Sequence, residues 1–120
     1  MTTQSAGPEE TAPYGSGPSA TGAPKPAKRV RTQHLRDMKE RGEKFTMLTA
    51  YEQYAAQTFD EAGIDVLLVG DSASNNVYGN ETSLPVTVDE LIPLTRAVSR
   101  SVRRALVVGD LPFGSYQASP

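Results

Sequence analysis

The sequence of 120 residues contains no cysteine, no tryptophan and a single histidine. Without cysteine the chain has neither a disulfide framework nor a thiol nucleophile. It also lacks the basic and apolar pattern of a signal peptide, and no apolar run approaches the ~20 residues that cross a membrane. A chain without disulfides, leader or membrane span is expected in the reducing cytoplasm, with no membrane partner.

Branched aliphatic residues are missing from the first part of the chain, and none occurs before Val30. Residues 1–28 hold five of the nine prolines and four of the ten glycines, set among Ser, Thr and Ala. Such a segment cannot bury enough apolar surface to offset the entropy lost on ordering. We therefore expect residues 1–28 to be a disordered tail and residues 29–120 to hold the folded domain.

The net charge is only −2, but it is unevenly distributed. Residues 25–44 contain eight basic side chains against three acidic ones, whereas residues 45–120 contain four against nine. The basic stretch contains no Phe, Tyr or Trp of the kind that stacks on bases. A solvated helix beside a linker is therefore favoured over nucleic-acid binding, and the sequence assigns the stretch no further role.

The chain does contain a repeated corner, in which apolar residues are followed by glycine and aspartate. One copy is Val-Leu-Leu-Val-Gly-Asp over residues 66–71, and the other is Leu-Val-Val-Gly-Asp over residues 106–110. Short continuous apolar runs are typical of strands buried on both faces in parallel sheets. The 39 residues from Asp71 to Asp110 span a loop and a long helical pattern, which is the content of one βαβ unit. If the strands are neighbours, both carboxylates leave the same edge of the sheet.

Two carboxylates that close repel one another, so either one is protonated or a cation lies between them. No histidine or cysteine is near in sequence, and an all-oxygen pair favours a hard ion such as Mg²⁺. Asp71 and Asp110 are therefore the candidate metal ligands. The motifs G-x-G-x-x-G and G-x-x-x-x-G-K-[ST] are absent, so nothing indicates a dinucleotide or P-loop site.

The remaining pattern predicts three strand–helix units after a first helix. The predicted strands are 45–49, 66–69 and 105–108, and the predicted helices are 32–41, 51–62 and 87–103. This order favours the amino-terminal part of a (β/α)₈ TIM barrel, its first three β/α units, over an open doubly wound sheet. A complete barrel needs about 250 residues, so residues 29–120 are interpreted as an incomplete barrel domain, from a fragment or a truncated product.

Several positions have specific expectations. Tyr54 and Phe59 are expected in the core, whereas Tyr51 follows a strand directly and is expected to reach the active edge. Residues 72–85 are long for a βα connection, and they are either a functional loop or simply a mobile one. The segment 87–90, Thr-Val-Asp-Glu, fits a helix capping box, while Pro93 inside the next helix predicts a kink or a later start.

Four blocks of the sequence closely resemble the ketopantoate hydroxymethyltransferase family. They are Met-Leu-Thr-Ala-Tyr at 47–51, Leu-Leu-Val-Gly-Asp-Ser at 67–72, Leu-Pro-Val-Thr-Val-Asp-Glu at 84–90 and Asp-Leu-Pro-Phe-Gly-Ser-Tyr at 110–116. Two small residues depart from the family's usual pattern, since Ser74 stands where many relatives have glycine and Gly109 where alanine is usual. The four blocks occur in the family's order over residues 32–117.

The resemblance implies a Mg²⁺-binding (β/α)₈ barrel. It implies transfer of a hydroxymethyl group from the co-substrate 5,10-methylenetetrahydrofolate to 3-methyl-2-oxobutanoate, through a Mg²⁺-stabilised enolate, on the pathway to pantothenate and coenzyme A. In the family's pattern Asp71 and Asp110 ligate the metal, and Asp71, Ser72 and Asp110 contact the substrate. The general base and a substrate-binding lysine are expected beyond residue 120, so the 120-residue chain alone is expected to be inactive. A homo-oligomer is expected for the full-length enzyme.

Two alternatives remain open at this point. One is another Mg²⁺-dependent barrel enzyme that acts on a 2-oxo acid, of the isocitrate lyase type. The other is a non-catalytic truncated fragment.

Overall fold

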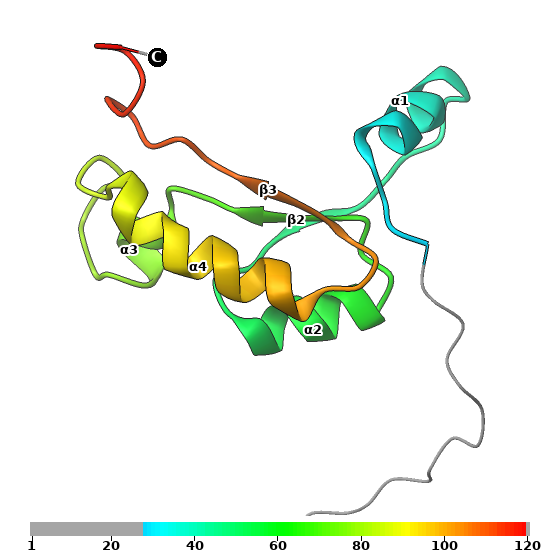
Figure 1. The fold of residues 1–120 in the computed structure, drawn as a ribbon, viewed down its shortest axis with the longest axis horizontal. Helices are drawn as coiled ribbons and strands as arrows, with labels where there is room; N and C mark the ends of the chain where they lie inside the picture. Colours follow the sequence, from blue (N-terminus) through cyan, green and yellow to red (C-terminus); the bar gives the residue numbers. More distant parts are fainter. Residues whose placement is uncertain (1–27, 120) are drawn as a thin grey trace, which may run out of the picture.

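The computed structural model describes residues 28–119, so the predicted disordered tail lies outside the described residues except for Lys28. Three parallel strands form one sheet in the order β1-β2-β3. Helices α2 and α4 cover one face of this sheet, α1 lies near the amino ends of the strands, and α3 follows β2 (Figure 1). The elements are α1 (Thr32–Glu40), β1 (Met47–Thr49), α2 (Gln53–Glu61), β2 (Val66–Val69), α3 (Ala73–Asn76), α4 (Val88–Ser101) and β3 (Leu106–Gly109).

The two predicted βαβ connections are present, because β1 pairs with β2 and β2 pairs with β3, both in parallel. In this register Val66 lies opposite Met47 on one side and Leu106 on the other. The strands that lead to Asp71 and Asp110 are therefore immediate neighbours, which is the condition under which both residues leave the same edge of the sheet.

The core lies between the sheet and helices α2 and α4. Leu67 and Val69 of β2 are fully buried there, together with Ala56 of α2 and Val98 of α4. Burying a Leu or Val side chain contributes about 1.5–3 kcal/mol relative to leaving it exposed. This layer therefore holds β2 in place, and with it the polar residues that follow the strand.

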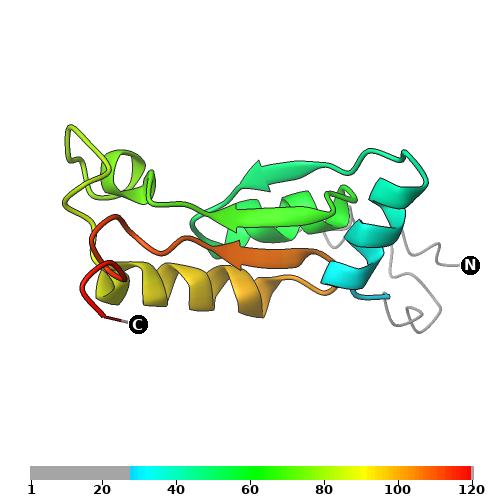
Figure 2. The same ribbon diagram turned by 90° about the horizontal axis from the view of Figure 1, so that it is seen from above.

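On the opposite side of the sheet the described residues place only α1, near the amino ends of the strands (Figures 1 and 2). Alternating side chains of the strands point to this face, and two of them, Met47 and Val108, are 44% and 37% exposed. Val66 lies on the same face and is only 2% exposed, so the face is covered near that residue and open elsewhere. Most side chains on this face are apolar, so the sheet is suited to burial on both faces, although α2 and α4 cover only one.

The helix signals in the sequence are largely confirmed. Thr87 caps α4, where its hydroxyl accepts a hydrogen bond from the Glu90 backbone N–H at 3.2 Å in the predicted capping box. Gly63 follows the end of α2 with φ +89°, a conformation that residues other than glycine rarely adopt. α4 ends at Ser101, two residues before the predicted end, and continues through Pro93. Proline has no backbone N–H, so the carbonyl one turn before Pro93 receives no hydrogen bond within the helix. Pro93 is exposed, so water can donate to that carbonyl instead.

The predicted core position of Tyr54 is wrong. Its side chain is 71% exposed, whereas Ala56, which was not among the expected core residues, is completely buried. Helix α2 packs closely against α4, and a small alanine allows that approach where a tyrosine would not. Phe59 is half-buried and packs on the core as expected.

None of the helices within residues 28–119 has the length and apolar character needed to cross a membrane.

A carboxylate pair at the carboxyl edge of the sheet

Asp71 and Asp110 meet at the carboxyl ends of β2 and β3. The backbone N–H of Asp71 donates a hydrogen bond to Oδ2 of Asp110 at 2.9 Å. The backbone N–H of Asp110 in turn donates to the carbonyl of Val69 at 3.0 Å, which extends the ladder between the two strands. The structure thus brings together the two residues that the repeated corner singled out.

The two corners are staggered by one residue. Val69 lies opposite Gly109, so Asp110 continues the register opposite Gly70 rather than opposite Asp71. The side chain of Asp110 therefore projects on the same side of the sheet as position 70. The equal sequence pattern of the two corners gave no indication of this offset.

Gly70 leaves the space in which these polar groups gather. A Cβ atom at this position would lie 3.1 Å from Oγ of Ser72 and 3.4 Å from Oδ2 of Asp110. The first distance is tighter than ordinary van der Waals contact, so a side chain here would displace the hydroxyl. The Ser72 hydroxyl and the Asp110 carboxylate therefore face one point above Gly70.

The carboxylate of Asp71 is half-buried, and its oxygens receive no hydrogen bond or ion pair from any residue between 28 and 119. Asp110 uses one oxygen for the Asp71 backbone and keeps the other free of protein partners in the same part of the chain. The described residues hold no group of three or more His, Cys, Asp or Glu that could bind a metal. Mg²⁺ is commonly held by one or two carboxylates with substrate and water completing its shell, so this donor set fits that ion.

Ser72 is linked to Tyr51, which follows β1. The phenol oxygen of Tyr51 lies 2.6 Å from Oγ of Ser72, and Nδ2 of Asn76 donates to the same phenol oxygen at 3.0 Å. Tyr51 thus reaches the carboxyl edge as expected. Asn76, on the short helix α3, is a member of the site that sequence reasoning missed, because only folding brings it beside Tyr51.

The connection 72–85 is internally bonded rather than loose. Ser74 is completely buried; its hydroxyl donates to the Thr82 carbonyl at 2.7 Å and accepts from Nδ2 of Asn80 at 3.1 Å. Tyr78 donates to the Glu90 carbonyl at 2.6 Å, which ties the loop to α4. Ser74 was noted in the sequence only as a departure from glycine, yet its hydroxyl closes the loop next to the carboxylate pair.

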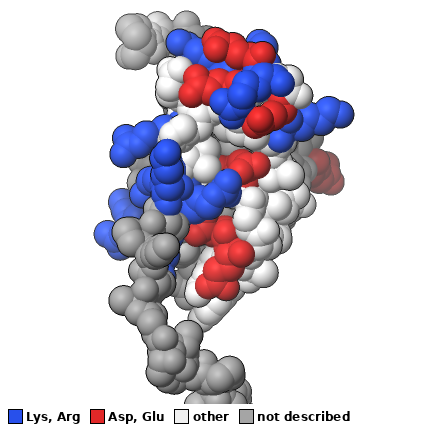
Figure 3. All heavy atoms as spheres, turned by 90° about the vertical axis from the view of Figure 1, so that its right-hand side faces the viewer, with Lys and Arg blue, Asp and Glu red and all other residues white. Residues whose placement is uncertain are grey.

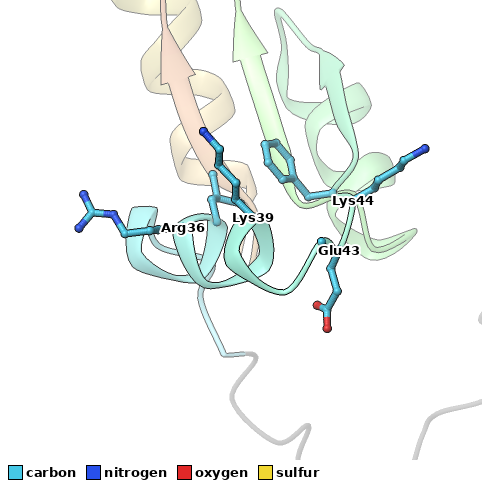
Figure 4. A pocket seen from close by; sticks show the side chains of 7 residues that line it. Arg36, Lys39, Glu43 and Lys44 are labelled. Carbon is cyan, nitrogen blue, oxygen red and sulfur yellow. The ribbon is translucent and has the colours of Figure 1, made fainter.

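A hollow of about 740 Å³ lies at the other end of the molecule, between α1 and the link to β1. Figure 4 shows that its charged side chains Arg36, Lys39, Glu43 and Lys44 point in different directions instead of converging. Glu43 is bonded to Arg41 at 3.0 Å. Size alone therefore does not make this hollow a site, and the converging groups above Gly70 are the better candidate.

The same end of the molecule carries the basic stretch. Figure 3 shows Lys and Arg interleaved with Asp and Glu on this face, without a continuous basic stripe over the described residues. Helix α1 itself alternates in this way, with Asp37 and Glu40 among its basic residues.

Fold and site together define a class: an α/β protein whose parallel strands present two aspartates at their carboxyl ends, where enzymes with parallel sheets carry their sites. The family model for ketopantoate hydroxymethyltransferase matches residues 29–120. The chain belongs to this family.

Several curated relatives match most of this chain. A 3-methyl-2-oxobutanoate hydroxymethyltransferase of Nocardioides sp. is 84% identical over 117 residues, which are 94% of this chain and 40% of the relative. Those of Paenarthrobacter aurescens and Saccharopolyspora erythraea are 69% and 64% identical, over 93% and 95% of this chain. The chain spans about 40% of the length of the Nocardioides relative. The chain therefore belongs with the ketopantoate hydroxymethyltransferase family and not with enzymes of the isocitrate lyase type.

Proposed function

We propose that this chain forms the metal- and substrate-binding part of a 3-methyl-2-oxobutanoate hydroxymethyltransferase. The reaction transfers a hydroxymethyl group from 5,10-methylenetetrahydrofolate to 3-methyl-2-oxobutanoate and gives 2-dehydropantoate, a precursor of pantothenate and coenzyme A. One structural observation carries the proposal: the two aspartates of the family's pattern are joined by the Asp71–Asp110 hydrogen bond at the ends of neighbouring strands.

The proposed architecture is the first three β/α units of a (β/α)₈ barrel, formed by residues 29–120. Its support is the parallel order β1-β2-β3, with the connecting helices α2 and α4 on the same face of the sheet. In a barrel the other face of each strand points inward and packs against layers of side chains from other strands. The half-exposed apolar residues Met47 and Val108 suit that position.

Each residue of the site has a defined task in this proposal. Asp71 and Asp110 would hold Mg²⁺ through the carboxylate oxygens that the described protein leaves free. The ion, when bound, would polarise the keto group of the 2-oxo acid and make its C3 proton more acidic. Ser72 would donate a hydrogen bond to the substrate carboxylate, which fixes the acid in one orientation at the carboxyl edge.

The proposed partners are the small-molecule 2-oxo acid and the folate, with neither nucleic acid nor membrane. Assembly into a homo-oligomer is part of the same proposal, by analogy with the family. The choice of these partners rests on the family assignment.

The test uses a hybrid enzyme, in which the complete 120-residue chain is joined to the part of the Nocardioides relative outside the match. The two sequences are 84% identical where they align, so the strands of one should complete the barrel of the other. We expect the hybrid to form 2-dehydropantoate from both substrates, only when Mg²⁺ is supplied. The 120-residue chain by itself is expected to give no turnover.

Two outcomes would contradict the proposal. A folded hybrid that binds neither 3-methyl-2-oxobutanoate nor Mg²⁺ would show that the carboxylate pair is not the site. Turnover of isocitrate-like substrates in place of the 2-oxo acid and folate would assign the lyase chemistry instead.

A further inference from the structure

The hydroxyl of Ser72 stands at the end of a three-member hydrogen-bond chain. Asn76 donates to the phenol oxygen of Tyr51 at 3.0 Å, and that oxygen lies 2.6 Å from Oγ of Ser72. The ring of Tyr51 is held by packing against a small buried cluster, formed by Ala73, Val86 and Leu91. Tyr51 thus joins the loop after β1 to the loop after β2, across the carboxyl edge of the sheet.

The donors and acceptors in this chain favour one direction. Asn76 can only donate through Nδ2, so the phenol oxygen of Tyr51 acts as acceptor there. If Ser72 also donated to Tyr51, the phenol proton would have no acceptor among residues 28–119. A phenol is also the stronger acid of the two hydroxyls and therefore the better donor. The direction Asn76 to Tyr51 to Ser72 gives the phenol proton an acceptor and leaves the Ser72 proton free for a ligand.

That free proton lies where a ligand would bind. A Cβ atom built on Gly70 would lie 3.1 Å from Oγ of Ser72 and 3.4 Å from Oδ2 of Asp110. A ligand atom at this point would therefore meet both groups. A hydroxyl presented as acceptor would repel a carboxylate brought to this point, whereas one presented as donor attracts it. The direction of the chain therefore decides whether Ser72 favours or opposes an anionic ligand.

We propose that Tyr51 and Asn76 are positioning residues that hold the Ser72 hydroxyl as a hydrogen-bond donor to the carboxylate of the 2-oxo acid. The proposal rests on the proposed function for the identity of the ligand. Neither residue touches the ligand; both act through Ser72. Their effect should appear in affinity for the 2-oxo acid, and much less in the chemical step.

The first experiment compares three tyrosines in the hybrid enzyme. Tyr51→Phe removes only the phenol oxygen and should raise the KM and the calorimetric Kd for 3-methyl-2-oxobutanoate about two- to tenfold, with kcat almost unchanged. Tyr54→Phe is the matched control, because Tyr54 is 71% exposed. Tyr78→Phe removes a structural bond of 2.6 Å to the Glu90 carbonyl. It should lower thermal stability without changing affinity.

The second experiment reverses the direction of the hydrogen bonds from residue 76 through Tyr51 to Ser72. Asn76→Asp keeps the size of the side chain but replaces a donor by an acceptor, so the phenol proton turns toward residue 76 and Ser72 must donate to Tyr51. Affinity for the 2-oxo acid should then fall further than in Tyr51→Phe. Asn75→Asp places the same charge on the adjacent residue, which bonds to the Asn80 carbonyl instead of Tyr51, and controls for repulsion alone.

The Ser72→Ala background completes the test. If Tyr51 acts through Ser72, Tyr51→Phe should change affinity less than about 1.5-fold once the serine hydroxyl is gone. Equal effects of Tyr51→Phe with and without Ser72 would overturn the proposal, as would equal effects of Asn76→Asp and Asn75→Asp. An unaltered hybrid that binds no 2-oxo acid would overturn the proposed function itself, which separates the two failures.

Discussion

The aspartates at the amino edge and at the carboxyl edge of the sheet differ in how many hydrogen bonds their carboxylates accept from the protein. At the amino edge, Asp60 accepts hydrogen bonds from three successive backbone N–H groups that lead into β3, those of Arg103 at 2.7 Å, Arg104 at 3.2 Å and Ala105 at 2.6 Å. Asp65 is bonded there to the Thr46 backbone, the Thr46 hydroxyl and the Arg104 guanidinium. These acids are engaged with the protein itself.

At the carboxyl edge, the carboxylate of Asp71 has no partner within residues 28–119 and Asp110 uses only one oxygen. Both edges contain aspartates beside strand ends, so composition alone does not distinguish them. The difference shows that an aspartate bonded throughout by backbone and arginine stabilises the fold, whereas one left with free oxygens is available to a ligand. Barrel enzymes separate stability and chemistry between their two ends in the same way.

Removing a ligand charge at the carboxyl edge should have the largest effect. Asp71→Asn in the hybrid enzyme is expected to reduce turnover more than about 100-fold and to weaken Mg²⁺ binding, because an amide lacks the charge that holds a hard cation. Thermal stability should hardly change, since Asp71 makes no side-chain bond in the described protein. Asp89→Asn, an exposed aspartate on α4, is the control. Wild-type activity and Mg²⁺ dependence in Asp71→Asn would remove the basis for the metal site.

The converse change at the amino edge should affect stability and spare Mg²⁺ binding. Asp60→Ala leaves three backbone N–H groups without their acceptor, and bonds to a charged group are worth about 1.5–3 kcal/mol each, not fully additive. We expect a loss of about 2–4 kcal/mol, measured as a lower thermal unfolding midpoint. Glu61→Ala, the next residue and exposed, should lose far less. Equal losses in the two variants would show that Asp60 does not anchor the entry to β3.

Gly70→Ala tests the carboxyl edge in a different way, because it adds a methyl group to the site without removing any polar group. The new Cβ would crowd the Ser72 hydroxyl at 3.1 Å, and turnover should fall about tenfold through displaced ligand contacts. Gly109→Ala is the matched change in the other corner. Its Cβ would meet only Thr95 at 3.5 Å, an ordinary contact, and activity should be kept. The reverse order of the two effects would contradict the role given to Gly70.

The smallest expected effect is a pH-dependent change in stability, which comes from Asp65 at the amino edge of the sheet. Burial opposes ionisation of Asp65, but hydrogen bonds from Thr46 and Arg104 outweigh it and hold the pKa of this carboxyl below its ordinary value. The folded-state pKa is therefore below the unfolded one, and the stabilisation is complete above the unfolded value and is lost as pH falls through the folded value.

Asp65→Asn should accordingly cost about 1 kcal/mol at pH 7. The difference from the unaltered protein should shrink as the pH falls below about 4, because the wild-type carboxyl then becomes protonated as well. Thermal unfolding of both proteins at pH 7 and at pH 3 measures this. A difference that stays constant over this range would mean that the charge of Asp65 contributes nothing.

Local patterns in the sequence determined most of the framework. The strand 66–69 is found at its predicted bounds, and the capping box at Thr87 marks the start of α4. The two Gly-Asp corners indicated that Asp71 and Asp110 share one edge if their strands are neighbours, and β2 and β3 do pair directly. These features follow from short-range physics, since strand burial, caps and turns depend on residues only a few positions apart.

The tertiary structure alone decided how the parts meet. It set Asp110 opposite Gly70 rather than Asp71, turned Tyr54 outward in favour of Ala56, and brought Tyr51 and Asn76 to Ser72. Each of these depends on register between strands or on the rotation of a helix against its neighbour. A shift of one residue costs nothing in the local pattern but exchanges every side chain from one face to the other. The choice is therefore made by packing across the sheet, between residues far apart in the chain.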